Sequence, residues 1–412
     1  MEVVDYKVTQ ERTALPDQAT AGKYRYLILV MGALVQFCCG IAYVWSVFQP
    51  YAKKTYALDL SQANLPFGIL LGLFAVGNLL GGYLQKKWNA TLIILAGGII
   101  MCLGLFLTAF VPVKLPWMLN VTYGCIAGFG CGITYNTVLA TLQSWFPDKR
   151  GMVTGIIICA SGSFGLVMNP IANSLLKTYG FRPAMIFVAT TLFIIIVCGG
   201  FFIKRPHPDY MRGYKPQKVV VTSKQYTIKE MLKTKQYYII ATTFALAVPA
   251  YFLMNPMLMS LGMERGLSSQ VALIGVMLVS GMNTVGRLLM PWISDWVGRK
   301  PILLFLFIFT MITIVLLTFA TGYGFLILVS CIALSYGGFM GMYPTINADY
   351  FGSQNAGMNY GVVMLGYAIS SIGCPYLVRL VLKSSMGITL SFVIAGIASV
   401  IGFMLILTLK KP

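Results

Sequence analysis

Charged residues are scarce in this chain of 412 residues, because Asp, Glu, Lys and Arg together make up only 10% of it. A soluble globular protein has about 25%. Hydrophobic residues account for 58% of the chain, and they gather in runs long enough to cross a lipid bilayer. The composition excludes a large soluble enzyme and predicts an all-α membrane protein, with the bilayer as its main partner.

Acidic residues and histidine are scarcer still, with 11 Asp and Glu and a single histidine, His207. All the acids lie in the N-terminal segment, in loops or at the ends of apolar runs. An enzyme in the membrane would need paired acids, a histidine cluster or a nucleophile with its base inside these runs. We therefore predict that the protein is not an enzyme.

Metal and nucleotide sites are not indicated either. The nine cysteines lie in apolar runs, without metal-ligand spacing to a histidine, which is typical of small packing residues. No glycine-rich segment ends in Lys-Ser or Lys-Thr, so a loop that cradles nucleotide phosphates is not expected. We predict no metal, no cofactor and no direct use of ATP.

Twelve apolar runs of about 20 residues can form membrane spans. A polar segment at 204–236 separates them into two groups of six, the pattern of a duplicated six-helix unit. The predicted organisation is a cytosolic N-terminal segment (1–26), a six-helix half (27–203), a cytosolic central loop (204–236), a second six-helix half (237–409) and a cytosolic tail (410–412). The predicted spans are 27–48, 65–85, 93–112, 117–143, 152–176, 183–203, 237–261, 270–293, 301–321, 325–347, 359–382 and 387–409.

The net charge of +19 lies in short loops between the spans, so membrane topology explains it better than nucleic-acid binding. With the N-terminus in the cytosol, 21 of the 30 Lys and Arg residues lie on the cytosolic side and 8 on the other. The positive-inside rule then places both termini in the cytosol of a multi-pass cell (inner) membrane protein. Docking of the basic loops on anionic lipid is compatible with the same pattern.

Arg287 is the exception, because it lies inside an apolar run with no acidic residue within seven positions. A long side chain near a span end can snorkel to the membrane surface. Alternatively, a buried Arg faces a cavity and a partner, since its insertion costs about 2.5–3.5 kcal/mol. With no acid in the spans, that partner can be a substrate carboxylate, which guanidinium binds in a bidentate fork. Asn283, four residues earlier on the same helix face, can bond the same ligand.

The segment "PWISDWVGRK" directly after this run resembles the loop signature of the major facilitator superfamily. Asp295, Gly298, Arg299 and Lys300 match that signature, and we expect them to form a conformational latch between two helices. Longer strings extend the resemblance to nearly all of the chain after residue 26. They are "GIAYVWSVF", "TYNTVLATLQSWFPDKRG", "NTVGRLLMPWISDWVGRK", "SYGGFMGMYPTINADYFG" and "NYGVVMLGYAISSIG".

These strings are similar to the oxalate/formate antiporter family, a branch of the superfamily related to monocarboxylate transporters. The resemblance implies twelve helices in two six-helix halves, alternating access and an organic-anion site between the halves. It also implies that Arg287 binds the substrate carboxylate and that aromatic residues wall the site. Tyr43, Tyr135 and Tyr336 occupy the matching aromatic positions.

The departures from the family pattern bear on the substrate. Oxalate-exchanging members place a Lys where this chain has Tyr367, and further aromatic positions are Met340, Met364 and Ser161 here. One Arg leaves the second carboxylate of oxalate unpaired, and burying an unpaired charge is costly. We therefore predict a monocarboxylate such as pyruvate, lactate or formate, with a dicarboxylate–monocarboxylate exchanger as the alternative. Tyr367 would then donate a hydrogen bond to the substrate. The alternative is that Tyr367 only packs against neighbouring side chains.

The mode of transport and the remaining polar residues stay open. Some monocarboxylate transporters carry an Asp for proton coupling where this chain has Asn283. Antiport, facilitated diffusion and symport with a co-transported ion are all compatible with the sequence. Asn136 can bond the substrate or cross-link helices. A carboxylate sensor that does not transport is an alternative of another class, and we expect a monomer.

Overall fold

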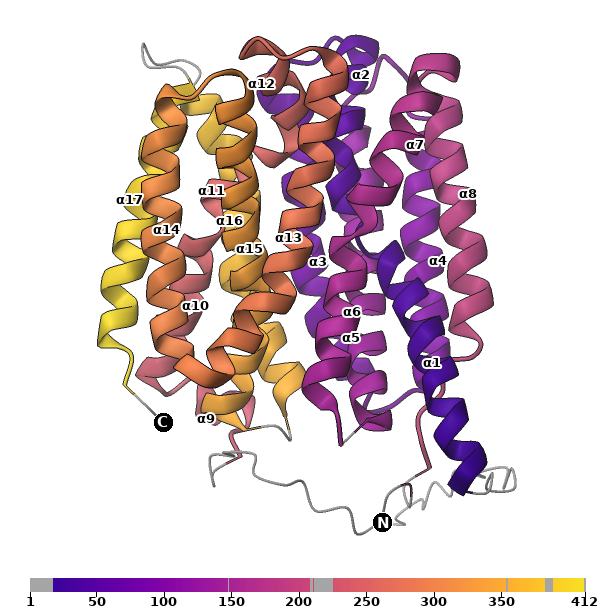
Figure 1. Ribbon diagram of the computed structural model, residues 1–412. Coiled ribbons are helices and arrows are strands. Elements are labelled where there is room, and N and C mark those ends of the chain that lie inside the picture. Colours follow the sequence, from indigo (N-terminus) through magenta and orange to yellow (C-terminus); the bar gives the residue numbers. More distant parts are fainter. Residues whose placement is uncertain are drawn as a thin grey trace, which may run out of the picture.

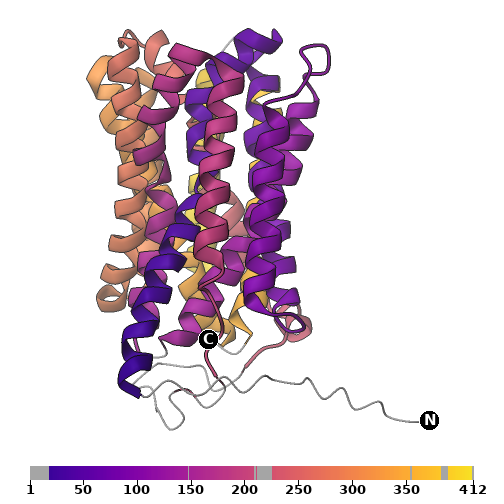
Figure 2. The same cartoon turned by 90° about the vertical axis from the view of Figure 1, so that its right-hand side faces the viewer.

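The structure is a computed structural model that describes residues 18–146, 148–207, 210, 225–352, 355–381 and 388–410. Every regular element within these ranges is a helix. Eleven helices are long and apolar enough to cross a membrane, and one bent pair supplies a twelfth span. The helices run roughly side by side along one direction (Figure 1, Figure 2), which confirms the predicted all-α membrane fold.

Eight spans are single helices, and the other four are built from two or more segments. The single helices are α3 (Leu60–Leu84), α4 (Ala90–Thr108), α8 (Phe181–Gly200), α13 (Ser269–Val297), α14 (Arg299–Phe319), α15 (Gly322–Phe351), α16 (Ala356–Val381) and α17 (Ile388–Thr408). The fourth span joins η2 (Asn120–Ala127), a π-helix, to α5 (Gly128–Trp145), and the fifth joins α6 (Arg150–Gly162) to α7 (Phe164–Tyr179). The short helix α9 (Ile228–Met231) precedes the seventh span.

The first span is broken by a bend of 43°. It consists of α1 (Gln18–Cys38), the 3₁₀ turn η1 (Ile41–Val44) and α2 (Trp45–Tyr56). A Cβ atom on Gly40 would clash with the carbonyl oxygen of Ser161, so glycine lets the chain approach the fifth span at the bend. The first span was predicted as a single run at 27–48. In the structure it is broken after Cys38, and its first helix begins earlier, at Gln18.

The seventh span is broken as well. It consists of α10 (Lys235–Ala247), α11 (Pro249–Phe252), the 3₁₀ turn η3 (Asn255–Met257) and α12 (Leu258–Glu264). Proline has no backbone N–H and interrupts helical hydrogen bonding. Pro249 begins α11, and Pro256 lies within η3. Two broken spans therefore occupy the first position in each predicted group of six.

The elements up to α8 lie on one side of the molecule and those from α9 onward on the other (Figure 1). Glycines let α3 and α16 meet closely along this interface, as small residues do between membrane helices. A Cβ atom on Gly68 would lie 2.5 Å from the Ser371 carbonyl oxygen, and one on Gly72 would lie 2.5 Å from Ile372. The Ser61 hydroxyl also donates to the Pro375 carbonyl at 3.2 Å.

The start of α1 and the end of α17 lie at the same end of the bundle (Figure 1), as an even number of spans requires. Which side of the membrane this end faces stays a prediction. The predicted N-terminal segment up to residue 17, much of the central loop and residues 411 and 412 of the tail lie outside the described residues.

We expect Gly68→Ala to lower the stability of the protein by about 1–3 kcal/mol, because the added methyl group would force α3 and α16 apart. Thermal unfolding in detergent measures this effect. Gly281→Ala is the matched control, since nothing lies within 4 Å of a Cβ atom at that helical position and Ala favours helix over Gly. Equal stability of the two variants would contradict the close contact of α3 and α16.

Candidate functional site

Arg287 lies on α13 with only 3% of its surface exposed. Its Nε atom donates to Asn283 Oδ1 at 3.1 Å, and its Nη1 atom donates to the Ile158 carbonyl at 3.1 Å and to the Ser161 hydroxyl at 2.9 Å. Its Nη2 atom donates to the hydroxyl of Tyr43. The guanidinium is thus held in the interior of the protein and does not reach toward the membrane surface.

The partners of this cation are all neutral. Among the described residues, no Asp or Glu forms an ion pair with Arg287, since the acids in the ion pairs are Asp148, Asp295 and Asp349. The ring of Tyr43 gives further electrostatic support, since its centroid lies 5.5 Å from the guanidinium carbon. The positive charge is therefore hydrogen-bonded but not neutralised by this part of the chain.

Close helix packing positions the Arg287 side chain. Cβ atoms on Gly337 and Gly286 would clash with backbone carbonyl oxygens, so α13 and α15 cross with their backbones in contact. Asn283 and Arg287 are one helical turn apart and share a face of α13. A Cβ atom on Gly162 would lie 3.3 Å from the Arg287 Cδ atom, so this glycine leaves room for the arginine stem.

A cavity of about 20 Å³ adjoins the guanidinium, which is room for about one water molecule. Its wall comes from both sides of the interface. Tyr43, Tyr135 and Ser161 line it from the N-terminal side, and Arg287 and Tyr367 line it from the C-terminal side. The structure therefore brings four of the predicted site residues together around one cavity, and Ser161 joins them there.

Two other predicted residues lie behind this wall. Tyr336 is fully buried, its hydroxyl lies 3.1 Å from that of Tyr367, and its ring stacks on Tyr251 with 4.0 Å between centroids. Asn283 positions Arg287 but does not line the cavity. Asn136 is not part of this group: its Nδ2 atom donates to the Asn78 carbonyl at 2.6 Å, which is the helix cross-link given as its alternative role.

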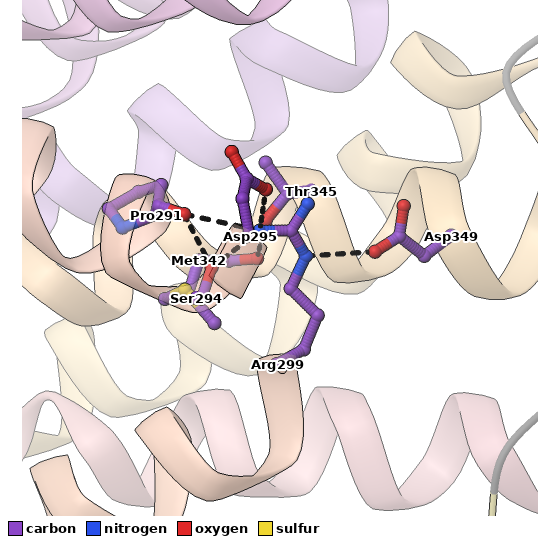
Figure 3. A network of polar contacts seen from close by, with 7 residues as sticks. All are labelled: Pro291, Ser294, Asp295, Arg299, Met342, Thr345 and Asp349. Carbon is purple, nitrogen blue, oxygen red and sulfur yellow. Dashed lines mark hydrogen bonds and ion pairs between the residues drawn. The ribbon is translucent and has the colours of Figure 1, made fainter. Parts of the chain in front are cut away.

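Two of the predicted latch residues, Asp295 and Arg299, belong to one network of polar contacts with Asp349 where α13 meets α14 (Figure 3). The Arg299 guanidinium lies 2.6 Å from Asp295 and donates to Asp349 at 2.9 Å. Gly298 joins the helices with a φ angle of +102°, which favours glycine. Lys300 donates to the carbonyls of Leu407 and Leu409 at the end of α17.

The sequence did not indicate three contributors to these sites. Ser161 stood out only as a departure from an aromatic position, although its hydroxyl accepts from Arg287. Tyr251 lies in an apolar run rich in aromatic residues, with no local feature that marks it. Asp349 follows an apolar run as an ordinary loop acid would, and its pairing with Arg299 depends on the packing of α14 against α15.

Comparison with known families settles the family of this fold. The family model described as Major Facilitator Superfamily matches residues 29–372. The chain belongs to the major facilitator superfamily. This confirms the predicted membership, and the protein is a multi-pass membrane transporter of that superfamily.

Curated relatives in the superfamily are similar at modest identity. The chain is 27% identical to the MFS-type transporter YhjX of Escherichia coli, over 84% of this chain and 86% of the relative. It is 27% identical to the oxalate:formate antiporter of Oxalobacter formigenes, over 92% of this chain and 90% of that relative. Human monocarboxylate transporter 11 is 27% identical over 54% of this chain and 46% of its own length.

We expect Asp349→Asn to destabilise this transporter more than Asp295→Asn does, though by no more than about 1 kcal/mol, the usual size of an exposed ion pair. Asp349 links α15 to α14 and its side chain is 38% exposed, whereas Asp295 pairs with the residue four positions along and is 58% exposed. Thermal unfolding in detergent compares the two variants. Glu264→Gln, at an exposed acid, is the control, and a larger loss for Asp295→Asn would contradict the ranking.

Proposed function

We propose that the protein is a secondary active transporter of small organic anions, with a monocarboxylate such as pyruvate, lactate or formate as its substrate. It works by alternating access between two six-helix halves, 27–203 and 237–409. The observation that carries the proposal is the buried guanidinium of Arg287, which lies against a cavity between the two sides. Its hydrogen-bond partners within the described part of the chain are all neutral.

A carboxylate is the ligand that suits this guanidinium best. A carboxylate binds two guanidinium N–H groups at once, and the attraction between the opposite charges adds to these hydrogen bonds. The Nη1 and Nη2 atoms now donate to the neutral oxygens of Ile158, Ser161 and Tyr43. A substrate carboxylate would replace these bonds with stronger ones and would neutralise the buried charge.

A single cation favours a single carboxylate. No Lys and no second Arg lines the cavity wall in the part of the chain that the structure describes, and a second carboxylate there would stay unpaired. Two relatives support a carboxylate substrate, one named a monocarboxylate transporter and one an oxalate:formate antiporter. The oxalate:formate antiporter matches over nearly its whole length, which keeps dicarboxylate–monocarboxylate exchange as the second candidate function.

We further propose how the transporter sits in the membrane and holds its conformation. The distribution of Lys and Arg favours a cell (inner) membrane with both termini in the cytosol. Asp295, Gly298, Arg299 and Lys300, together with Asp349, act as a latch at the end of the bundle that holds the termini. The protein works as a monomer that exchanges or co-transports an ion.

We expect Arg287→Gln to abolish uptake of labelled pyruvate into proteoliposomes, because Gln removes the charge and the bidentate fork. Arg182→Gln, at an exposed arginine, should leave uptake unchanged. The thermal midpoint of each purified variant shows whether it is folded. A folded Arg287→Gln protein with full carboxylate uptake would rule out the anchor role.

We expect Tyr367→Lys to shift preference from monocarboxylates toward oxalate, because it adds a second cation to the same cavity wall. The measurement is the concentration of oxalate that halves the uptake of labelled pyruvate, which should fall at least tenfold. Tyr367→Phe is the control, since it removes the hydroxyl without adding charge. An unchanged oxalate concentration would count against charge as the basis of the selectivity.

A further inference from the structure

The wall of the cavity beside Arg287 is divided between polar and apolar side chains. The groups that bond the guanidinium come from α13, α6 and η1. The helix α3 lines the same cavity with Leu70, Leu71 and Phe74. Phe74 follows the two leucines by four and three positions, so all three side chains share one face of the helix. This apolar face of α3 is therefore a part of the wall that supplies none of the bonds to the arginine.

Further apolar groups extend this face around the cavity. Ala42 lines it from η1, and Met340 lines it from α15. The ring of Tyr135 meets that of Phe74 edge to face, with 5.1 Å between centroids. Among the described residues on this wall, only Arg287 is charged. A cavity with one cationic end and an apolar remainder fits an anion that carries an apolar group, because removing that group from water is favourable.

Close helix packing holds the apolar face of α3 in place. A Cβ atom on Gly128 of α5 would clash with the Leu70 carbonyl oxygen. A Cβ atom on Gly132, one turn later, would clash with the Phe74 carbonyl oxygen. The helix α16 also packs closely on α3 through glycines. Because the backbone of α3 cannot move back without disturbing these contacts, the wall resists any group that is too large for the cavity.

The space in front of this wall is small. The cavity of about 20 Å³ has room for about one water molecule, so side chains must move apart to admit a substrate. Each carbon atom that a substrate adds gains hydrophobic free energy, but it also needs more movement of a close-packed wall. These two effects oppose each other, so affinity should reach its maximum at a short chain.

We propose that the apolar face of α3, formed by Leu70, Leu71 and Phe74, determines specificity by receiving the methyl end of the substrate and limiting its length. Arg287 binds the carboxylate at the other end of the same molecule. The substrates are then monocarboxylates with a short tail that ends in a methyl group. This class contains pyruvate and lactate but not formate, which has no tail. The inference rests on the proposed function and narrows its substrate class.

Straight-chain acids from formate to pentanoate test the proposal, because they carry the same carboxylate and differ only in the length of the tail. The measurement is the concentration of each acid that halves the uptake of labelled pyruvate into proteoliposomes, with protein-free liposomes as the background. From formate to propionate, this concentration should fall about fourfold for each added carbon. For pentanoate it should be about tenfold higher than for propionate, because the longer tail meets the wall.

Leu71→Ala should move the maximum of affinity to longer acids, because it shortens a side chain of the wall. The concentration for pentanoate should fall about tenfold, whereas that for formate, which does not reach α3, should stay unchanged. Leu192→Ala is the matched control, since Leu192 on α8 is also buried but does not line the cavity. The control should leave the order of the acids unchanged, and thermal unfolding in detergent shows that both variants fold.

Ala42→Val makes the opposite change, because it adds carbon atoms to the wall of the same cavity. The concentration for propionate should rise about tenfold, and that for formate should stay unchanged. This second variant keeps the inference testable if Leu71→Ala does not fold. A fall for propionate, or equal changes for propionate and formate, would contradict a wall that selects by length.

The outcomes separate this inference from the function on which it rests. Equal weakening of every acid by Leu71→Ala would assign Leu71 to packing and overturn the inference. The same order of acids in Leu71→Ala as in the unmodified protein would overturn it as well. In both cases, loss of pyruvate uptake in Arg287→Gln would still support carboxylate transport. If the unmodified protein takes up neither pyruvate nor any acid of the series, the proposed function fails together with the inference.

Discussion

The structure depends on Arg287, a buried cation that has no acidic partner among the residues that the structure describes. Arg287 is held by a carbonyl, two hydroxyls and an amide, each of which supplies a partial negative charge. These groups come from the first, fifth and eighth spans, so the same bonds that solvate the guanidinium also join the two sides of the molecule. The cavity, the tyrosines around it and the glycine-mediated helix crossings are arranged around this group.

The scarcity of acidic residues has a physical meaning in this context. A protein carboxylate beside Arg287 would form a strong and lasting ion pair, because separating two charges in a medium of low dielectric is costly. Neutral partners hold the guanidinium more weakly and can be exchanged for a ligand. The described acids lie toward the ends of the helices, where Arg299 gathers two of them, and none competes for the central cation.

The fold and the centre of the candidate site could be predicted from the sequence, because both follow from local composition. Long apolar runs define the spans, and an isolated Arg within one of them marks a special environment. The position of Asn283 beside Arg287 follows from helical periodicity alone, because the two residues are four positions apart on one helix. The roles of Ser161, Tyr251 and Asp349 could not be predicted, since each depends on a neighbour far away in the chain. Asn136 was predicted as a site residue from its polar side chain within a span, but this side chain joins α5 to α3 through its hydrogen bond to Asn78.

The breaks in the first and seventh spans have a mechanical consequence. The tip segments α2 and α12 are joined by a hydrogen bond of 3.1 Å from the Ser260 hydroxyl to Gln49, so they form a pair at the end of the bundle opposite the start of α1 (Figure 1). Helical hydrogen bonding is already interrupted below each tip. A helix bends more readily where its regular hydrogen bonding is interrupted, so these two breaks are the points at which the tips could tilt relative to the rest of their spans.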